Sequence, residues 1–127
     1  MLNSEIRAIS KNFPQGLRRD FDAHIYYAPS QRDLALSLQT KMRKSFSSQP
    51  IFVGELIDRL VGPHPQCMFE TNFGAEYLSL VMDWLRENRH ELNVLVHIVT
   101  GNDKRDHSEG AIWLGEALAL DVSKLDP

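Results

Sequence analysis

The chain has 127 residues, of which 43% are hydrophobic and 24% charged, and this is the size and composition of one ordinary globular domain. Its net charge is −3 with neutral histidines, and no segment collects Lys and Arg, which argues against a nucleic-acid or membrane-surface partner. We see no signal-peptide-like or membrane-spanning stretch, and Cys67 is the only cysteine, so we expect a reduced, cytoplasmic protein without disulfides.

The chain divides into a short arm and a single domain. Residues 1–20 are mixed and polar, and Pro14 and Gly16 interrupt any helix, so we interpret them as an N-terminal arm. The domain then covers residues 21–127. Neither part contains an internal repeat or a low-complexity segment.

Hydrophobic periodicity predicts the secondary structure of the domain. Aromatic and β-branched residues predict strands, apolar stripes at helical spacing predict helices, and Gly and Pro mark the turns. In chain order the predicted elements are a strand at 21–28, a helix that begins near Ser30 and is closed by Pro50, strands at 51–61 and 67–73, a helix within 74–90 and a strand at 92–99.

The order strand, helix, strand, strand, helix, strand is typical of the ferredoxin-like fold of the α+β class. In that βαββαβ arrangement an antiparallel sheet carries two helices on one face. The segment after Thr100 is a C-terminal extension to this core, and Trp113 and Leu114 in it are expected to cover apolar surface.

Alternation along the predicted strands assigns their side chains to faces. One set in each strand is apolar and suits packing under the helices. The other sets contain His24, Glu70 and His97. Because the first strand of a ferredoxin-like sheet lies between the third and the fourth, these three side chains are predicted on neighbouring strands of the helix-free face.

Two imidazoles and one carboxylate on adjacent strands have the composition of the facial triad that binds non-haem iron(II) and leaves coordination positions open. A single buried histidine or glutamate is more often a hydrogen-bonded core residue than a metal ligand. The location of all three residues on one face is the feature that favours a metal site. His64, in a proline turn, is either a solvated tip or a site residue. His107 is either an exposed loop residue or a helix cap.

Three stretches resemble the DOPA 4,5-dioxygenase family: GPHPQCMFE (62–70), WLRENRHELNVLVHIVTGND (84–103) and DHSEGAIWLGEALALD (106–121). The stretch DAHIYYAP near the start fits the same pattern, so the resemblance runs from about Phe21 to Asp121. It implies a ferredoxin-like fold and extradiol cleavage of a catechol ring with iron(II) and dioxygen.

The resemblance places the family's histidines at His24, His64, His97 and His107, and its acidic residue at Glu70. The chain departs from the family at two positions. Ile98 stands where the family usually has a proline after the histidine of the fourth strand, and Asp22 stands where some bacterial relatives have the first histidine of a His-x-His motif.

We therefore predict an extradiol dioxygenase that acts on a catechol such as DOPA, with iron(II) that zinc or nickel could replace in a crystal. The predicted metal ligands are His24, His97 and Glu70, and the predicted catalytic residues are His64 and His107, for proton transfer and substrate orientation, and Tyr26, for a hydrogen bond to substrate. Nothing in the residues selects one catechol over another.

Two other functions fit the predicted fold. One is a module that binds a metal or small ligand without turning it over, and the other is a cofactor-independent monooxygenase of the dimeric α/β-barrel kind. Apolar side chains such as Met68 and Leu95 on the helix-free face need cover, and the extension supplies only part of it. A second subunit is the expected source of the rest, so we predict a homodimer.

Overall fold

A computed structural model describes residues 18–125, so most of the predicted N-terminal arm lies outside the described residues. The strands are β1 (Phe21–Tyr27), β2 (Phe52–Val53), β3 (Cys67–Phe73), β4 (Val94–Ile98) and β5 (Ala111–Leu114). The α-helices are α2 (Arg32–Ser45), α3 (Leu78–Asn88) and the single turn α4 (Asp103–Asp106), and short 3₁₀ turns lie at Pro29–Gln31, Ala75–Tyr77 and Val122–Lys124.

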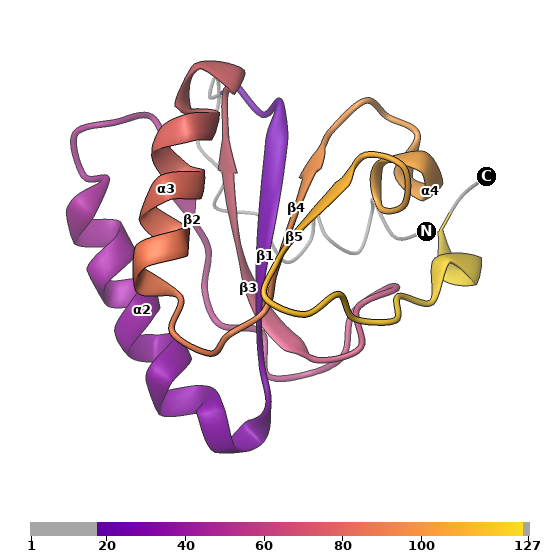
Figure 1. Ribbon diagram of the computed structural model, residues 1–127, viewed down its shortest axis with the longest axis horizontal. Helices are drawn as coiled ribbons and strands as arrows, with labels where there is room; N and C mark the ends of the chain where they lie inside the picture. The colour runs from indigo at the N-terminus through magenta and orange to yellow at the C-terminus, as the bar shows by residue number, and fades with distance from the viewer. Residues whose placement is uncertain (1–17, 126–127) are drawn as a thin grey trace.

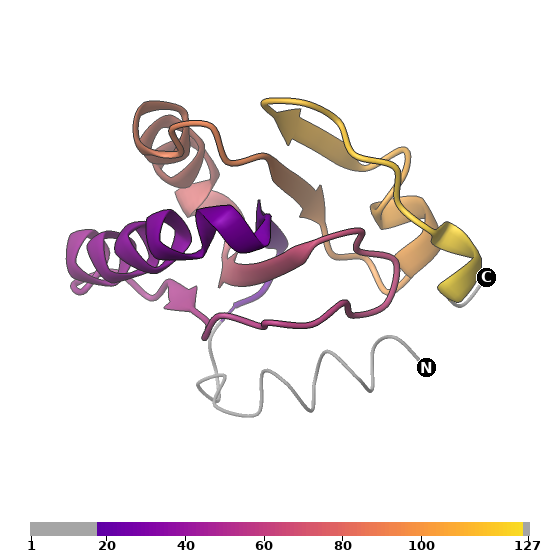
Figure 2. The ribbon, with the colours of Figure 1, turned by 90° about the horizontal axis from the view of Figure 1, so that it is seen from below.

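The strands form one antiparallel sheet in the order β2-β3-β1-β4-β5. The first strand lies between the third and the fourth, as the ferredoxin-like order requires, and the predicted fold class is confirmed. Helices α2 and α3 pack on one face, while α4 and the C-terminal segment lie on the opposite side (Figure 1, Figure 2). No helix within residues 18–125 is long and apolar enough to cross a membrane.

The main core lies between the sheet and the two long helices. Strand β1 directs Ala23, Ile25 and Tyr27 toward the helices, because alternate side chains of a strand point to the same face. Helix α2 contributes Leu38 and Met42, which are four residues apart and therefore share one helical stripe. Because these apolar side chains pack under the helices, the alternate side chains of β1 lie on the helix-free face, where they can form a site.

The predicted strand at residues 51–61 is wrong in its length. Only Phe52 and Val53 pair continuously with β3, and Ile57 returns to make one isolated bridge with Met68. From Val53 to Ile57 the chain advances four residues while β3, from Met68 to Thr71, advances three, so one extra residue forms a bulge.

Gly54 lies at the start of this bulge, and the backbone there approaches β3 closely. A Cβ atom on Gly54 would lie 3.2 Å from the main-chain oxygen of Glu70. The Gly54 carbonyl turns away from the sheet and accepts a hydrogen bond from Nε2 of Gln39 on α2, at 2.7 Å. The apolar sequence of residues 51–61 gives no sign of this bulge, and the predicted strand is therefore longer than the observed one.

A second, smaller apolar cluster covers part of the helix-free face. Its buried members are Tyr26, Ile57, Val61, Met68, Leu95 and Leu125, against which Ala111, Trp113, Leu118, Leu120 and Val122 pack. The extension thus covers apolar surface, as predicted. It also does something the sequence analysis did not anticipate, because β5 pairs with β4 as a fifth strand of the sheet.

Candidate active site

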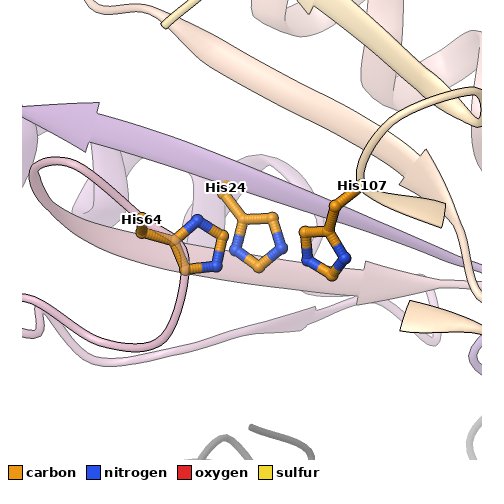
Figure 3. A group of neighbouring side chains, drawn as sticks. All are labelled: His24, His64 and His107. Atoms are coloured by element: carbon orange, nitrogen blue, oxygen red, sulfur yellow. The ribbon is translucent and has the colours of Figure 1, made fainter. Parts of the chain in front are cut away.

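Four histidines meet on the helix-free face, next to the second apolar cluster. His24 comes from the central strand β1 and His97 from its neighbour β4, while His64 and His107 come from connecting segments. All four are at most 5% exposed. The ring centres of His24 and His64 are 4.3 Å apart, and those of His97 and His107 are 4.1 Å apart. Figure 3 shows the ring of His24 between those of His64 and His107.

His64 is presented by the turn that precedes β3. Its N–H donates to the main-chain oxygen of Val61 at 3.1 Å, which closes the turn over Gly62 and Pro63. Gly62 has a φ of 54°, a conformation that glycine adopts without strain. The imidazole Nδ1 of His64 lies 2.7 Å from the hydroxyl of Tyr26, which is fully buried on β1. Sequence alternation could not place His64, since it lies outside the strands.

His107 follows α4 directly and is fixed through the backbone of that turn. Its N–H and its ring Nδ1–H both donate to the main-chain oxygen of Asp103, at 3.0 and 2.7 Å. The carboxylate of Asp106 accepts hydrogen bonds from the N–H and the hydroxyl of Thr100, at 2.7 and 2.6 Å, which ties the end of α4 to the end of β4. The loop therefore holds His107 in one orientation.

Hydrogen bonds to main-chain oxygens determine the tautomers of two of these histidines. A carbonyl oxygen only accepts, so Nδ1 carries the proton in His107 and also in His97, whose Nδ1–H donates to the oxygen of Ile98 at 2.8 Å. Nε2 of His107 is then an unprotonated nitrogen without a partner within residues 18–125, whereas Nε2 of His97 is an unprotonated nitrogen that acts as an acceptor. Nε2–H of His24 donates to Nε2 of His97 at 3.0 Å.

Several of the buried ring nitrogens have no hydrogen-bond partner within residues 18–125: Nδ1 of His24, Nε2 of His64 and Nε2 of His107. Buried polar atoms are rarely left unsatisfied, and imidazole nitrogens are common metal ligands. Two groups of residues place their ligand atoms within 4.8 Å of one another, namely His24 with His64 and His107, and Asp22 with His24 and His97. This donor set fits a divalent transition metal.

Burial and mutual proximity keep the imidazoles of His24, His64 and His107 neutral. Burial, followed by the nearby His107 and His97, lowers the pKa of His64 to about 3. Burial and His97 lower the pKa of His107 to about 4. The pKa of His24 falls well below its usual range, again through burial and then through the neighbouring histidines. Metal binding requires neutral imidazole, so the cluster is ready to bind a metal at neutral pH.

The structure brings the sequence-predicted site residues together on one face. His24 and Glu70 are cross-strand partners, and Oε2 of Glu70 lies 3.8 Å from Nδ1 of His24. Glu70 belongs to neither group of close ligand atoms. The hydroxyl of Tyr26 is directed at His64, and burial raises the pKa of Tyr26 well above its usual value.

A polar network that the sequence analysis did not assign to the site lies beside His97. Asp22 is the cross-strand partner of His97, and its Oδ2 lies 3.8 Å from Nε2 of His97. Arg19 donates to both carboxylate oxygens of Asp22, and Nδ2 of Asn72 donates to Oδ1. Asp22 and Asn72 share the strand faces of His24 and Glu70, so alternation could have found them.

Comparison with known proteins agrees with this geometry. Residues 21–124 match the model of the Dopa 4,5-dioxygenase family. The chain belongs to this family. The sequence-based recognition, which ran from about Phe21 to Asp121, is confirmed, and family membership indicates a dioxygenase-like enzyme at the family level.

Relatives and a solved structure support the same assignment. An uncharacterized 21.2 kDa protein of Botryotinia fuckeliana is 35% identical, covering 97% of this chain and 76% of its own. The DOPA 4,5-dioxygenase of Amanita muscaria is 29% identical over 84% of this chain, which spans 50% of that enzyme's length. The crystal structure of a "putative dioxygenase" from Nostoc punctiforme superposes with a TM-score of 0.74 at 34% identity, covering 84% of this chain and 90% of that one.

Proposed function

We propose that this protein is an extradiol dioxygenase that uses iron(II) and dioxygen to cleave a catechol ring. The observation that carries the proposal is the convergence of four buried imidazoles, three of which have a ring nitrogen without a hydrogen-bond partner within residues 18–125, in a member of the Dopa 4,5-dioxygenase family. Iron(II) held there would supply the redox chemistry that allows dioxygen to react with an aromatic ring. The substrate class is a catechol such as DOPA.

We assign His24 and His97 as two of the metal ligands. Their Nε2 atoms are 3.0 Å apart, and two ligands at right angles on a metal about 2.1 Å away are separated by about 3.0 Å. Both residues lie on paired strands, which hold the ligands rigidly. A carboxylate on the same face completes a two-histidine, one-carboxylate set, for which the sequence predicts Glu70. This set leaves positions open for substrate.

The remaining two histidines handle protons and orient substrate in this proposal. Nε2 of His107 is bare and takes a proton from a catechol hydroxyl. Nε2 of His64 takes the second catechol proton and returns it during ring opening. The hydroxyl of Tyr26 both donates and accepts, so it supports either tautomer of His64 and lets Nε2 alternate between acid and base. Tyr26 thus acts through His64.

The test compares metal content with turnover in matched variants. After anaerobic loading with iron(II), the wild-type protein should consume dioxygen and form a yellow ring-fission product with some member of a catechol panel. His97→Ala should lose both metal and activity. His107→Gln should retain metal and catechol binding but lower turnover by roughly two to four orders of magnitude. His90→Asn, at an exposed position beyond α3, is the control.

Each other outcome has a definite meaning. Lost metal in His107→Gln together with retained metal in His97→Ala would assign the metal to His24, His64 and His107. Metal binding without oxygen uptake on any catechol would make the protein a binding module. Oxygen uptake that survives metal removal would favour a cofactor-independent monooxygenase. The cytoplasmic location and the homodimer stay predictions.

A further inference from the structure

The polar network around Asp22 lies against the two strand histidines and has no role in the chemistry described so far. We propose that Asp22 is the carboxylate ligand of the metal, and that Glu70 instead supports His24 from the opposite side of its ring. This inference rests on the proposed function, because it names the third ligand of the same site.

The position of Asp22 suits a ligand. The ligand atoms of Asp22, His24 and His97 lie within 4.8 Å of one another, and the Nε2 atoms of the two histidines are already at the spacing of adjacent ligands. Oδ2 of Asp22 lies 3.8 Å from Nε2 of His97, so it must approach by about 0.8 Å to reach the ~3.0 Å separation of adjacent ligands.

The hydrogen bonds of Asp22 leave one lone pair, on the oxygen that faces the histidines. A carboxylate offers about four lone-pair sites. Within residues 18–125, Oδ1 accepts from Nε of Arg19 at 2.7 Å and from Nδ2 of Asn72 at 2.6 Å, and Oδ2 accepts only from Nη2 of Arg19, at 2.6 Å. The remaining site is therefore on Oδ2, the atom nearest His97. Three donors also fix the carboxylate plane, as outer partners do for metal ligands.

Glu70 lies on the other side of His24. Its Oε2 is 3.8 Å from Nδ1 of His24, whereas Nε2 of the same ring faces His97. In the metal-free protein Nε2–H of His24 donates to His97. When a metal takes the place of that proton, the carboxylate at Nδ1 would favour the tautomer with the proton on Nδ1. His24 would then match His97, whose Nδ1–H is held by a main-chain oxygen. Glu70 is a positioning residue in this arrangement.

The experiment measures metal affinity by chelator competition, together with the visible spectrum of the cobalt(II)-loaded protein. Glu70→Gln should weaken binding by about 10- to 100-fold, the usual effect of losing an outer-shell partner, with the cobalt bands unmoved. Asp22→Asn should weaken binding further and shift the bands, because a ligand atom changes. Asp22→Glu keeps the charge and should recover part of the affinity.

The matched control is Asp58→Asn. Asp58 also accepts two hydrogen bonds from one arginine, Arg32, and a further one from Tyr27, but it belongs to neither group of close ligand atoms. Its substitution should leave metal affinity unchanged. Circular dichroism and thermal unfolding of each metal-free variant separate misfolding from ligand loss.

The inference is overturned if Asp22→Asn keeps wild-type affinity and bands, if Glu70→Gln loses more metal than Asp22→Asn, or if the wild-type protein binds no divalent metal. A wild-type protein that binds metal through Asp22 but consumes no oxygen with any catechol would refute the proposed function and leave the ligand assignment intact.

Discussion

The metal-free protein should lose stability steeply in mild acid, because three of its buried histidines resist protonation. The pKa of His64 is about 3 and that of His107 about 4, and the pKa of His24 is also far below normal. Unfolded histidine has a pKa near 6.5, so between about pH 4 and 6.5 the unfolded chain binds more protons than the folded one. Stability therefore rises with pH and is lost as pH falls through 6.5.

The size of the effect follows from the same values. Lowering the pH from 7.5 to 5.5 costs about 1.3 kcal/mol for each histidine that is protonated only in the unfolded state. Three such residues give about 4 kcal/mol, a large part of the ~5–15 kcal/mol that stabilises an ordinary domain. Urea unfolding of metal-free protein at several pH values measures it directly.

Two variants locate the cause. His64→Gln removes one of the three groups and should reduce the loss to about two thirds of the wild-type value. His90→Asn removes an exposed histidine at a positive φ that asparagine tolerates, and should leave the loss unchanged. A free energy of unfolding that varies by less than about 1 kcal/mol between pH 7.5 and 5.5 would refute the reasoning.

Three further predictions test other parts of the structure. Tyr26→Phe should lower turnover and reduce the free energy of unfolding by about 1–3 kcal/mol, because Nδ1 of His64 loses its buried partner. The control Tyr27→Phe, which breaks the hydrogen bond to Asp58, should leave turnover unchanged. Equal turnover in both variants would remove Tyr26 from the mechanism. Gly54→Val should lower the free energy of unfolding by about 1–3 kcal/mol, since the added side chain meets the backbone of β3, and urea unfolding measures this. An unchanged urea midpoint would mean that the bulge accommodates the side chain. Sedimentation at micromolar concentration should show a homodimer, and a monomer there would contradict that expectation.

The parts of the fold that obey simple periodicity could be predicted from the sequence. Strand β3 begins and ends where the alternation of residues 67–73 predicts, and the shared face of His24, Glu70 and His97 follows from the same rule. The bulge at Gly54 escaped prediction because it depends on a contact with β3. The four residues of β5 escaped too, since so short a segment becomes a strand only through pairing with β4.

The site shows the same division. His64 and His107 lie in turns, where no periodicity specifies direction, and only the family resemblance pointed to them. Asp22 was missed for a different reason. Alternation along β1 places Asp22 on the face of His24, but its contacts with Arg19 and Asn72 join separate places in the chain and exist only in the folded structure.

Two of the four histidines lie on strands and two lie in connecting segments, and these segments should differ in how readily they open locally. His24 lies on a strand that is hydrogen-bonded on both sides, whereas His64 and His107 are held by a turn and by a single helical turn. Local openings with small free energies occur in such connecting segments and seldom in central strands. In hydrogen–deuterium exchange we therefore expect slow amides at residues 23–26 and faster ones at 62–66 and 102–108. The strand that carries His24 would then stay folded, while the segments that carry His64 and His107 open and close many times before the domain unfolds.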